Sequence, residues 1–254
     1  MRGVRIERQG RLAVLRLDKA RGNAIDEPLA EDLARAAAEV AQDAGVRGVL
    51  LASAHAKLFC PGLDLVALAG YDRPAMERFM ARFAVTVWAL FGLPKPVVAA
   101  VSGAAVAGGC ILALTADHRV LKRGAPIGLN EVKVGVPLPW SVTRLLRATL
   151  HAPALGRVAL LGRNFTDTEA IDLGLAHEIA EAEGFEGTCL ARLEEFADKD
   201  PLALATTKAW LRESVLAEMM AHESERVGAF LDGWFSEGTQ ERIRATVAAL
   251  QSKG

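Results

Sequence analysis

The sequence predicts an α/β fold, and two repeated segments carry that prediction. In each, a short apolar strand runs into a glycine-containing loop that is followed by a helix. The strands are expected at 48–52 and 96–101, and the loops at 56–65 and 101–110. Strands that alternate with helices in this way indicate an α/β region. Sites in such folds usually lie beyond the carboxyl ends of the strands, so both loops are candidates for function.

The other elements of the first half follow from local patterns. Apolar residues alternate on both sides of Gln9-Gly10, which predicts a β-hairpin at the N-terminus. Asp26-Glu27-Pro28 predicts a helix start, because the acid can cap the first turn and proline is tolerated there. Apolar residues at helical spacing between 76 and 90 predict a second helix, and residues 118–121 are expected to be extended.

Beyond about residue 140 the pattern becomes helical. Thr166-Asp167-Thr168-Glu169 has the spacing of a capping box, and Asp200-Pro201 is typical of a helix start. Helices are expected at about 201–221, 223–235 and 238–251. Four aromatic residues in this part are expected to divide between the core and an oligomer interface: Trp210, Phe230, Trp234 and Phe235.

Composition excludes several classes of function. The chain has 254 residues, 51% of them hydrophobic, which suffices for a large core. Its 30 basic and 31 acidic residues leave no basic excess for nucleic acid. The apolar runs are too short and too interrupted by glycine to span a membrane. No targeting segment is recognised, and three separated cysteines suit the reducing cytosol, so a cytoplasmic protein is expected.

Motifs for other chemistries are missing from the sequence. It contains no G-x-S-x-G, no phosphate-binding loop and no dinucleotide fingerprint, and its five histidines lack metal-ligand spacing. What remains is the two loops and one downstream carboxylate, Glu131. Backbone N–H groups in such loops can hold a developing oxyanion, and a carboxylate can move a proton. This combination predicts chemistry beside a carbonyl, without a metal or a covalent nucleophile.

These segments resemble the crotonase superfamily, the enoyl-CoA hydratase/isomerase family. Asn23-Ala24-Ile25 is similar to its early substrate-lining segment, 59–64 to its first oxyanion loop and 107–110 to its second. The resemblance implies a spiral of ββα turns over 1–195 and a helical oligomerisation region over 196–254. It also implies an acyl-CoA thioester substrate, no cofactor beyond the CoA of that substrate, and a homotrimer or dimer of trimers.

The resemblance also implies the roles of individual residues. Glu131 would be the catalytic acid–base, and the oxyanion donors would be the N–H groups of Leu63 and Gly108. Glycines in these loops allow backbone to approach a ligand closely. The implied substrate-binding residues are Ala24, Lys57, Leu58, Gly62, Asp64, Leu65, Gly109 and Trp140.

The acids indicate which reaction of the family is expected. Family hydratases carry two glutamates, and the position of the first is occupied here by Ile111, while the second corresponds to Glu131. A single base suits an isomerase, and four segments (61–65, 107–110, 112–115 and 127–131) resemble the mitochondrial-type Δ3,Δ2-enoyl-CoA isomerases. Pro61 departs from that pattern, because a small residue is usual there. Hydration, thioester hydrolysis, decarboxylation and non-catalytic acyl-CoA binding stay as alternatives.

Simpler roles compete for several of these residues. Glu131 suits a helix start or an ion pair, and Asp64 suits a helix cap more than an acid. Lys19, Arg21 and Lys57 are candidates for the CoA phosphates or solvated surface charges. Trp140 is either a wall of the acyl pocket or part of the core.

Overall fold

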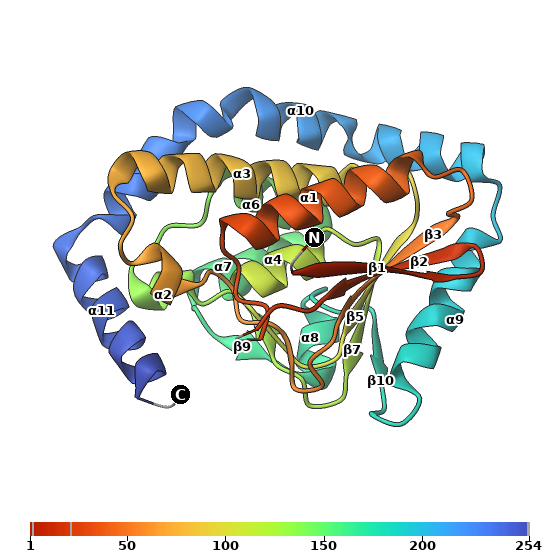
Figure 1. The fold of residues 1–254 in the computed structure, drawn as a ribbon, viewed down its shortest axis with the longest axis horizontal. Coiled ribbons are helices and arrows are strands. Elements are labelled where there is room, and N and C mark those ends of the chain that lie inside the picture. Colours follow the sequence, from red (N-terminus) through yellow and green to blue (C-terminus); the bar gives the residue numbers. More distant parts are fainter. Residues whose placement is uncertain (2, 21, 253–254) are drawn as a thin grey trace.

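The main sheet of the computed structural model, which describes residues 1, 3–20 and 22–252, has six strands. Its spatial order is β1-β2-β3-β5-β7-β10, and only β1 and β2 are antiparallel (Figure 1). Its strands are β1 (Val4–Gln9), β2 (Leu12–Leu17), β3 (Gly48–Ser53), β5 (Val97–Val101), β7 (His118–Lys122) and β10 (Glu178–Ala180). The predicted hairpin and the strands at 48–52, 96–101 and 118–121 are confirmed.

Helices cover both faces of this sheet. Alternate side chains of β2, β3 and β5 enter one core with α1 (Glu27–Gln42) and α3 (Arg73–Phe91), and the others enter a second core with α9 (Phe185–Ala197). Burial on both faces explains why these strands are almost uniformly apolar. Asp26 caps α1 by accepting a hydrogen bond from the Leu29 N–H, as predicted.

A second, four-stranded sheet was not expected from the sequence. Its order is β4-β6-β8-β9, with β4 (Leu58–Cys60), β6 (Ala104–Val106), β8 (Ile127–Gly128) and β9 (Asn164–Phe165). The first three strands are parallel to one another, and β9 is antiparallel to β8. Both glycine loops therefore contain a strand, too short to show a two-residue period.

Short helices connect the two sheets and surround the smaller one. They are α2 (Leu65–Leu68), α4 (Gly108–Leu114), α5 (Glu131–Val134), α6 (Trp140–Thr149), the 3-10 helix Ala152–Ala154, α7 (Leu155–Leu160) and α8 (Asp167–Asp172). The predicted capping box is wrong. Thr166 precedes α8 without a side-chain cap, and Glu169 instead pairs with Arg157 and Arg163 on the surface.

The C-terminal helices run over the outside of the core. The expectation of separate helices at 201–221 and 223–235 is wrong, because α10 (Pro201–Trp234) is continuous. No glycine or proline interrupts it near Glu223, which is buried and accepts hydrogen bonds from the N–H and hydroxyl of Ser141. Figure 1 shows α10 extending along α3, and α11 (Glu237–Gln251) standing beside α2. Asp200 caps α10, as predicted.

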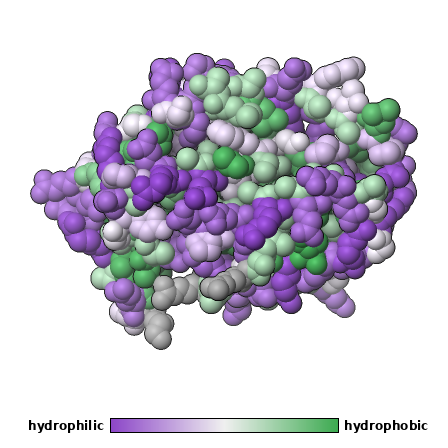
Figure 2. Space-filling view, turned by 45° about the horizontal axis from the view of Figure 1, so that its top comes forward, coloured by the Kyte–Doolittle hydropathy of each residue, from purple (hydrophilic) through white to green (hydrophobic). Residues whose placement is uncertain are grey.

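The C-terminal aromatic residues divide between the core and the surface of the single chain, and an interface at the exposed ones stays a prediction. Trp210 is 73% exposed, whereas Phe230 and Trp234 are buried. On the face drawn in Figure 2, hydrophobic residues are interspersed among hydrophilic ones.

All three cysteines are free and buried. Among the described residues, no helix has the length and apolar character needed to cross a membrane.

Candidate active site

The smaller sheet brings the two glycine loops and Glu131 together. The glycines of the first loop follow β4, those at the end of the second follow β6, and Glu131 comes three residues after β8. Because these strands are parallel neighbours, their carboxyl ends meet at one edge of the sheet. The site is therefore assembled from segments about 40 and 20 residues apart in the chain.

The two loops are packed directly against each other. Gly62 has φ of +99°, and a Cβ there would lie 2.9 Å from Cβ of Ala107 and 3.1 Å from the Gly108 nitrogen. A Cβ on Gly109 would lie 1.9 Å from the carbonyl oxygen of Cys60, a contact that no side chain tolerates. The glycines are thus required for loop-to-loop packing, and Ala107 accepts φ of 49° to turn the chain into α4.

Two backbone N–H groups at this junction are available to a ligand. Leu63 forms a parallel bridge with Ile25, in which the Ile25 and Asp64 N–H groups donate but that of Leu63 does not. Gly108 is the first residue of α4, so its N–H has no acceptor inside the helix. Neither N–H has a hydrogen-bond acceptor among the described residues. Both residues line the same cavity, as an oxyanion site requires.

Glu131 begins α5, and its carboxylate lies across the cavity from the loops. Its Oε2 is buried without a hydrogen-bond partner in the described part of the chain, although the residue as a whole is only partly buried. This burial raises the pKa of Glu131 to about 7, and the backbone N–H groups of Glu131 and Asn130 partly offset the shift. A carboxylate with one free oxygen and a pKa near neutrality is suited to taking and returning a proton.

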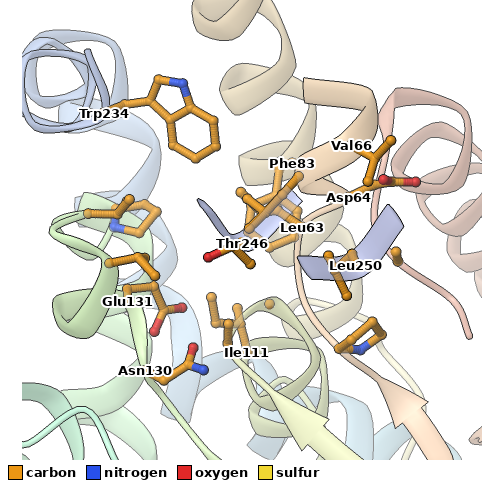
Figure 3. A pocket seen from close by; sticks show the side chains of 18 of the residues that line it. Leu63, Asp64, Val66, Phe83, Ile111, Asn130, Glu131, Trp234, Thr246 and Leu250 are labelled. Atoms are coloured by element: carbon orange, nitrogen blue, oxygen red, sulfur yellow. The ribbon is translucent and has the colours of Figure 1, made fainter. Parts of the chain in front are cut away.

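The cavity that joins these groups has a volume of about 910 Å³ and a largely apolar lining. In Figure 3, Ile111, Asn130 and Glu131 lie at one level of the cavity. Leu63 and Phe83 lie opposite Glu131, and Trp234 lies above it. Ile111 comes from α4 and places a hydrocarbon side chain near the carboxylate of Glu131 (Figure 3). The polar side chains in the lining are those of Asp64, Asn130, Glu131, Thr246 and Gln251.

The structure brings most of the expected site residues to this cavity. Seven of them line it: Ala24, Leu58, Leu63, Asp64, Leu65, Gly108 and Glu131. Gly62 and Gly109 lie behind the lining, where they permit the close packing of the loops. Lys57 is exposed. Trp140 is not part of the lining; its ring packs between Arg144 and Arg226, and its indole N–H donates to the carbonyl of Glu218.

Lys19 and Asp64 have structural partners. Asp64 caps α2 by accepting a hydrogen bond from the Ala67 N–H, which confirms the prediction of a helix cap. The ammonium of Lys19 lies 2.8 Å from Asp26, 3.2 Å from Asp64 and 2.6 Å from the carbonyl oxygen of Ala24. Two carboxylates and one carbonyl thus hold the Lys19 ammonium inside the protein. Arg21, the other basic candidate nearby, lies outside the described residues.

The sequence analysis missed the contribution of the C-terminal helices. Phe230 and Trp234 of α10, and Thr246, Leu250 and Gln251 of α11, all line the cavity. From the sequence, Phe230 and Trp234 were expected in the core or an oligomer interface, and not at the cavity. Met80, Phe83, Val134 and Val136 complete the apolar wall.

Comparison with known proteins identifies the family. A model of the enoyl-CoA hydratase/isomerase family matches residues 7–239. The chain belongs to the enoyl-CoA hydratase/isomerase family. This confirms the resemblance seen in the two loops, and the ββα architecture with long C-terminal helices agrees with it.

Individual members of this family resemble the chain along most of its length. A putative enoyl-CoA hydratase of Thermus thermophilus is 34% identical, covering 95% of this chain and 96% of the relative. The human mitochondrial enoyl-CoA delta isomerase 1 is 26% identical, covering 95% and 81%. The crystal structure of human mitochondrial Δ3-Δ2-enoyl-CoA isomerase superposes with a TM-score of 0.94 at 24% identity over 99% of each chain.

The described residues contain no group of three or more His, Cys, Asp or Glu side chains placed to hold a metal ion. His55, the histidine nearest the first loop, lies with Nε2 2.9 Å from the carbonyl oxygen of Lys19. Two carboxylates line the cavity, Glu131 and the helix-capping Asp64, together with the two backbone donors.

Proposed function

We propose that this protein is a Δ3-to-Δ2 enoyl-CoA isomerase that uses Glu131 as its single proton carrier. The observation that carries the proposal is that the Glu131 carboxylate, whose buried Oε2 has no hydrogen-bond partner in the described part of the chain, lines the same cavity as Ile111. A base is present, and the neighbouring position that family hydratases fill with a second glutamate holds a hydrocarbon. The proposed substrate is an acyl-CoA thioester, and the reaction needs no cofactor.

The proposed reaction moves one proton and one double bond. Glu131 removes a proton from C2 of a 3-enoyl-CoA, and the electrons of that bond pass to the thioester oxygen as a dienolate. The N–H groups of Leu63 and Gly108 hold this oxyanion, an interaction worth about 3–4 kcal/mol per donor in comparable sites. The dienolate collapses with a double bond between C2 and C3, while protonated Glu131 returns its proton to C4.

The surroundings of Glu131 favour proton return over hydration. Activation of water in the family hydratases requires a second acid, and Ile111 has neither donor nor acceptor. Its side chain is 2% exposed and keeps that wall of the cavity apolar. An apolar wall disfavours a bound water beside the dienolate.

Enoyl-CoA hydration is the second candidate. It is favoured by the Thermus thermophilus relative at 34% identity, which is named a putative enoyl-CoA hydratase. It requires an acid other than a side chain at position 111. Asp64 lines the cavity, but its carboxylate is occupied by the Ala67 N–H and the Lys19 ammonium.

The assembly we propose is a homotrimer or a dimer of trimers. Exposed apolar side chains support self-association, since several large ones lie on the surface of α7 and α10. They are Leu160 at the end of α7 and Leu202, Trp210, Leu211 and Met220 on α10.

Incubation in heavy water with trans-3-enoyl-CoA and, separately, trans-2-enoyl-CoA tests the proposal by mass spectrometry. We expect the 3-enoyl substrate to become the 2-enoyl product, and the 2-enoyl substrate to gain little water. Glu131→Gln should lower the isomerisation rate by at least about a thousandfold and leave acyl-CoA binding in place. Formation of a 3-hydroxyacyl product instead would establish the hydratase.

Glu218→Gln is a matched control, because Glu218 pairs with Arg144 away from the cavity. This variant should keep full activity. Equal activity of Glu131→Gln and the parent would overturn the mechanism. Tight binding without turnover of either substrate by the parent would indicate a non-catalytic acyl-CoA binder.

A further inference from the structure

The cavity has two chemically different sides. Asp64 and Val66 lie on one side of Leu63 and Thr246, whereas Glu131 and Trp234 lie on the other (Figure 3). The side of the first loop includes Asp64 and the ends of α2. The other side is lined by Val136 and the two aromatic residues of α10, and Glu131 is its one ionisable group among the described residues.

An aromatic pair forms the wall on the side of Glu131. Phe230 and Trp234 are one helical turn apart on α10, and their rings stack with centroids 6.0 Å apart at 25°. Their exposed fractions are 4% and 2%, although both line the cavity. Figure 3 shows the indole of Trp234 projecting into the cavity above the level of Glu131. A ring in this place occupies space that a longer acyl chain would need.

The wall is held rigidly where it meets the helix of Glu131. Gly233 lies so close to the segment after α5 that a Cβ on it would be 2.4 Å from Cδ of Pro137. The hydroxyl of Thr239 donates to the carbonyl of Gly135 at 3.0 Å, and Gln240 donates to the carbonyl of Trp234 at 2.7 Å. The end of α10 is therefore fixed relative to α5, so Trp234 cannot retreat without breaking these contacts.

We propose that Trp234 is the specificity-determining residue that limits the length of the acyl group, and that this group is an unsubstituted hydrocarbon. This inference rests on the proposed function for the position of the thioester between Leu63 and Gly108. With the thioester there, the acyl carbons beyond C2 pass Glu131 and reach Phe83, Phe230 and Trp234. These side chains offer apolar contact and no partner for a charged substituent, whose burial would be costly.

The test compares acyl-CoA substrates of different length on the parent, Trp234→Phe and Trp234→Leu. The readout is the ratio of kcat/KM for trans-3-dodecenoyl-CoA to that for trans-3-hexenoyl-CoA. Each methylene accommodated in an apolar pocket changes such a ratio severalfold. We expect the ratio to rise roughly tenfold or more in Trp234→Leu and less in Trp234→Phe. A ratio equal to that of the parent in Trp234→Leu would overturn the proposal.

Comparison of these ratios separates an effect on chain-length specificity from an effect on the stability of the protein. A ratio measured within one variant does not depend on the fraction of protein that is folded. Phe185→Leu is the matched control, because it removes a buried ring from the core on the far side of the main sheet. Its length ratio should equal that of the parent, and a rise like that of Trp234→Leu would overturn the assignment to Trp234.

Calorimetric binding of saturated hexanoyl-CoA and dodecanoyl-CoA distinguishes this inference from the proposed function. If no 3-enoyl-CoA is isomerised but Trp234→Leu still shifts binding toward the longer chain, the length limit stands and the isomerase fails. If isomerisation occurs without a shift, the inference fails alone. Stacked aromatic rings also suit a quaternary ammonium, so stronger binding of an acyl-CoA ending in trimethylammonium than of its hydrocarbon counterpart would overturn the hydrocarbon assignment.

Discussion

At the scale of single residues, the environment of Glu131 makes the stability of the fold depend on pH. Its folded pKa of about 7 lies above the ordinary value of 4.5, because burial disfavours the charged form. The folded state therefore holds this proton more tightly than the unfolded state. Glu131 costs no stability below about pH 4.5, and the cost grows as the pH rises to 7.

We predict that Glu131→Gln is more stable than the parent at pH 8 but not at pH 4.5. The gain at pH 8 should be on the order of 2–3 kcal/mol, since the variant removes the cost of ionising a buried carboxylate. Urea denaturation of both proteins across this pH range measures it. A stability difference that does not change with pH would mean that the carboxylate is solvated in the folded protein.

At the scale of elements, Lys19 connects the two helix caps that frame the first loop. Asp26 caps α1 and Asp64 caps α2, and both carboxylates lie near the Lys19 ammonium. The same segment bridges Leu63 through Ile25, so the position of the Leu63 N–H depends on it. Lys19 thus supports the segment that holds Leu63, the proposed oxyanion donor, although it was considered a candidate for CoA phosphates from its sequence alone.

Lys19→Met should destabilise the protein by about 1–3 kcal/mol, because it leaves the largely buried Asp64 carboxylate without its cation. We also expect kcat to fall while KM for acyl-CoA changes little, since the loop and not the CoA site is loosened. The exposed Lys57→Met is the control and should change stability by less than about 0.5 kcal/mol. A large rise in KM with unchanged stability would instead place Lys19 at the CoA phosphates.

Some of these elements could be predicted from the sequence, and others could not. The hairpin, the first helices and the strands β3, β5 and β7 of the main sheet were predictable because their apolar patterns extend over about five residues or more, whereas the three-residue β10 was not predicted. The smaller sheet was not, because β8 and β9 have only two residues each and β4 and β6 only three. Residues 166–169 have the residue types of a capping box, but two surface arginines form ion pairs with Glu169 instead.

At the scale of the whole molecule, the site combines parts that differ in how far they can be predicted. The meeting of the loop residues and Glu131 at one cavity was predictable, because they belong to local motifs. The place of Phe230 and Trp234 was not, because it depends on α10 returning across the cavity from a distant part of the chain. Trp140 is close to Glu131 in the sequence, but its side chain contacts α10 and does not join the cavity. The division at 195/196 stays a prediction, and α9 continues to Ala197.

The assembly is the last property of the whole molecule that the sequence predicts. The 34-residue α10 exposes Trp210 and Leu211, with 73% and 76% of their surfaces in solvent in the single chain. Burying two such side chains in an interface would stabilise association by about 1.5–3 kcal/mol each. We predict that sedimentation equilibrium gives three or six times the 27.0 kDa chain mass. Trp210→Glu with Leu211→Glu should shift that mass downward, whereas a parent that sediments as a monomer would contradict the trimeric proposal.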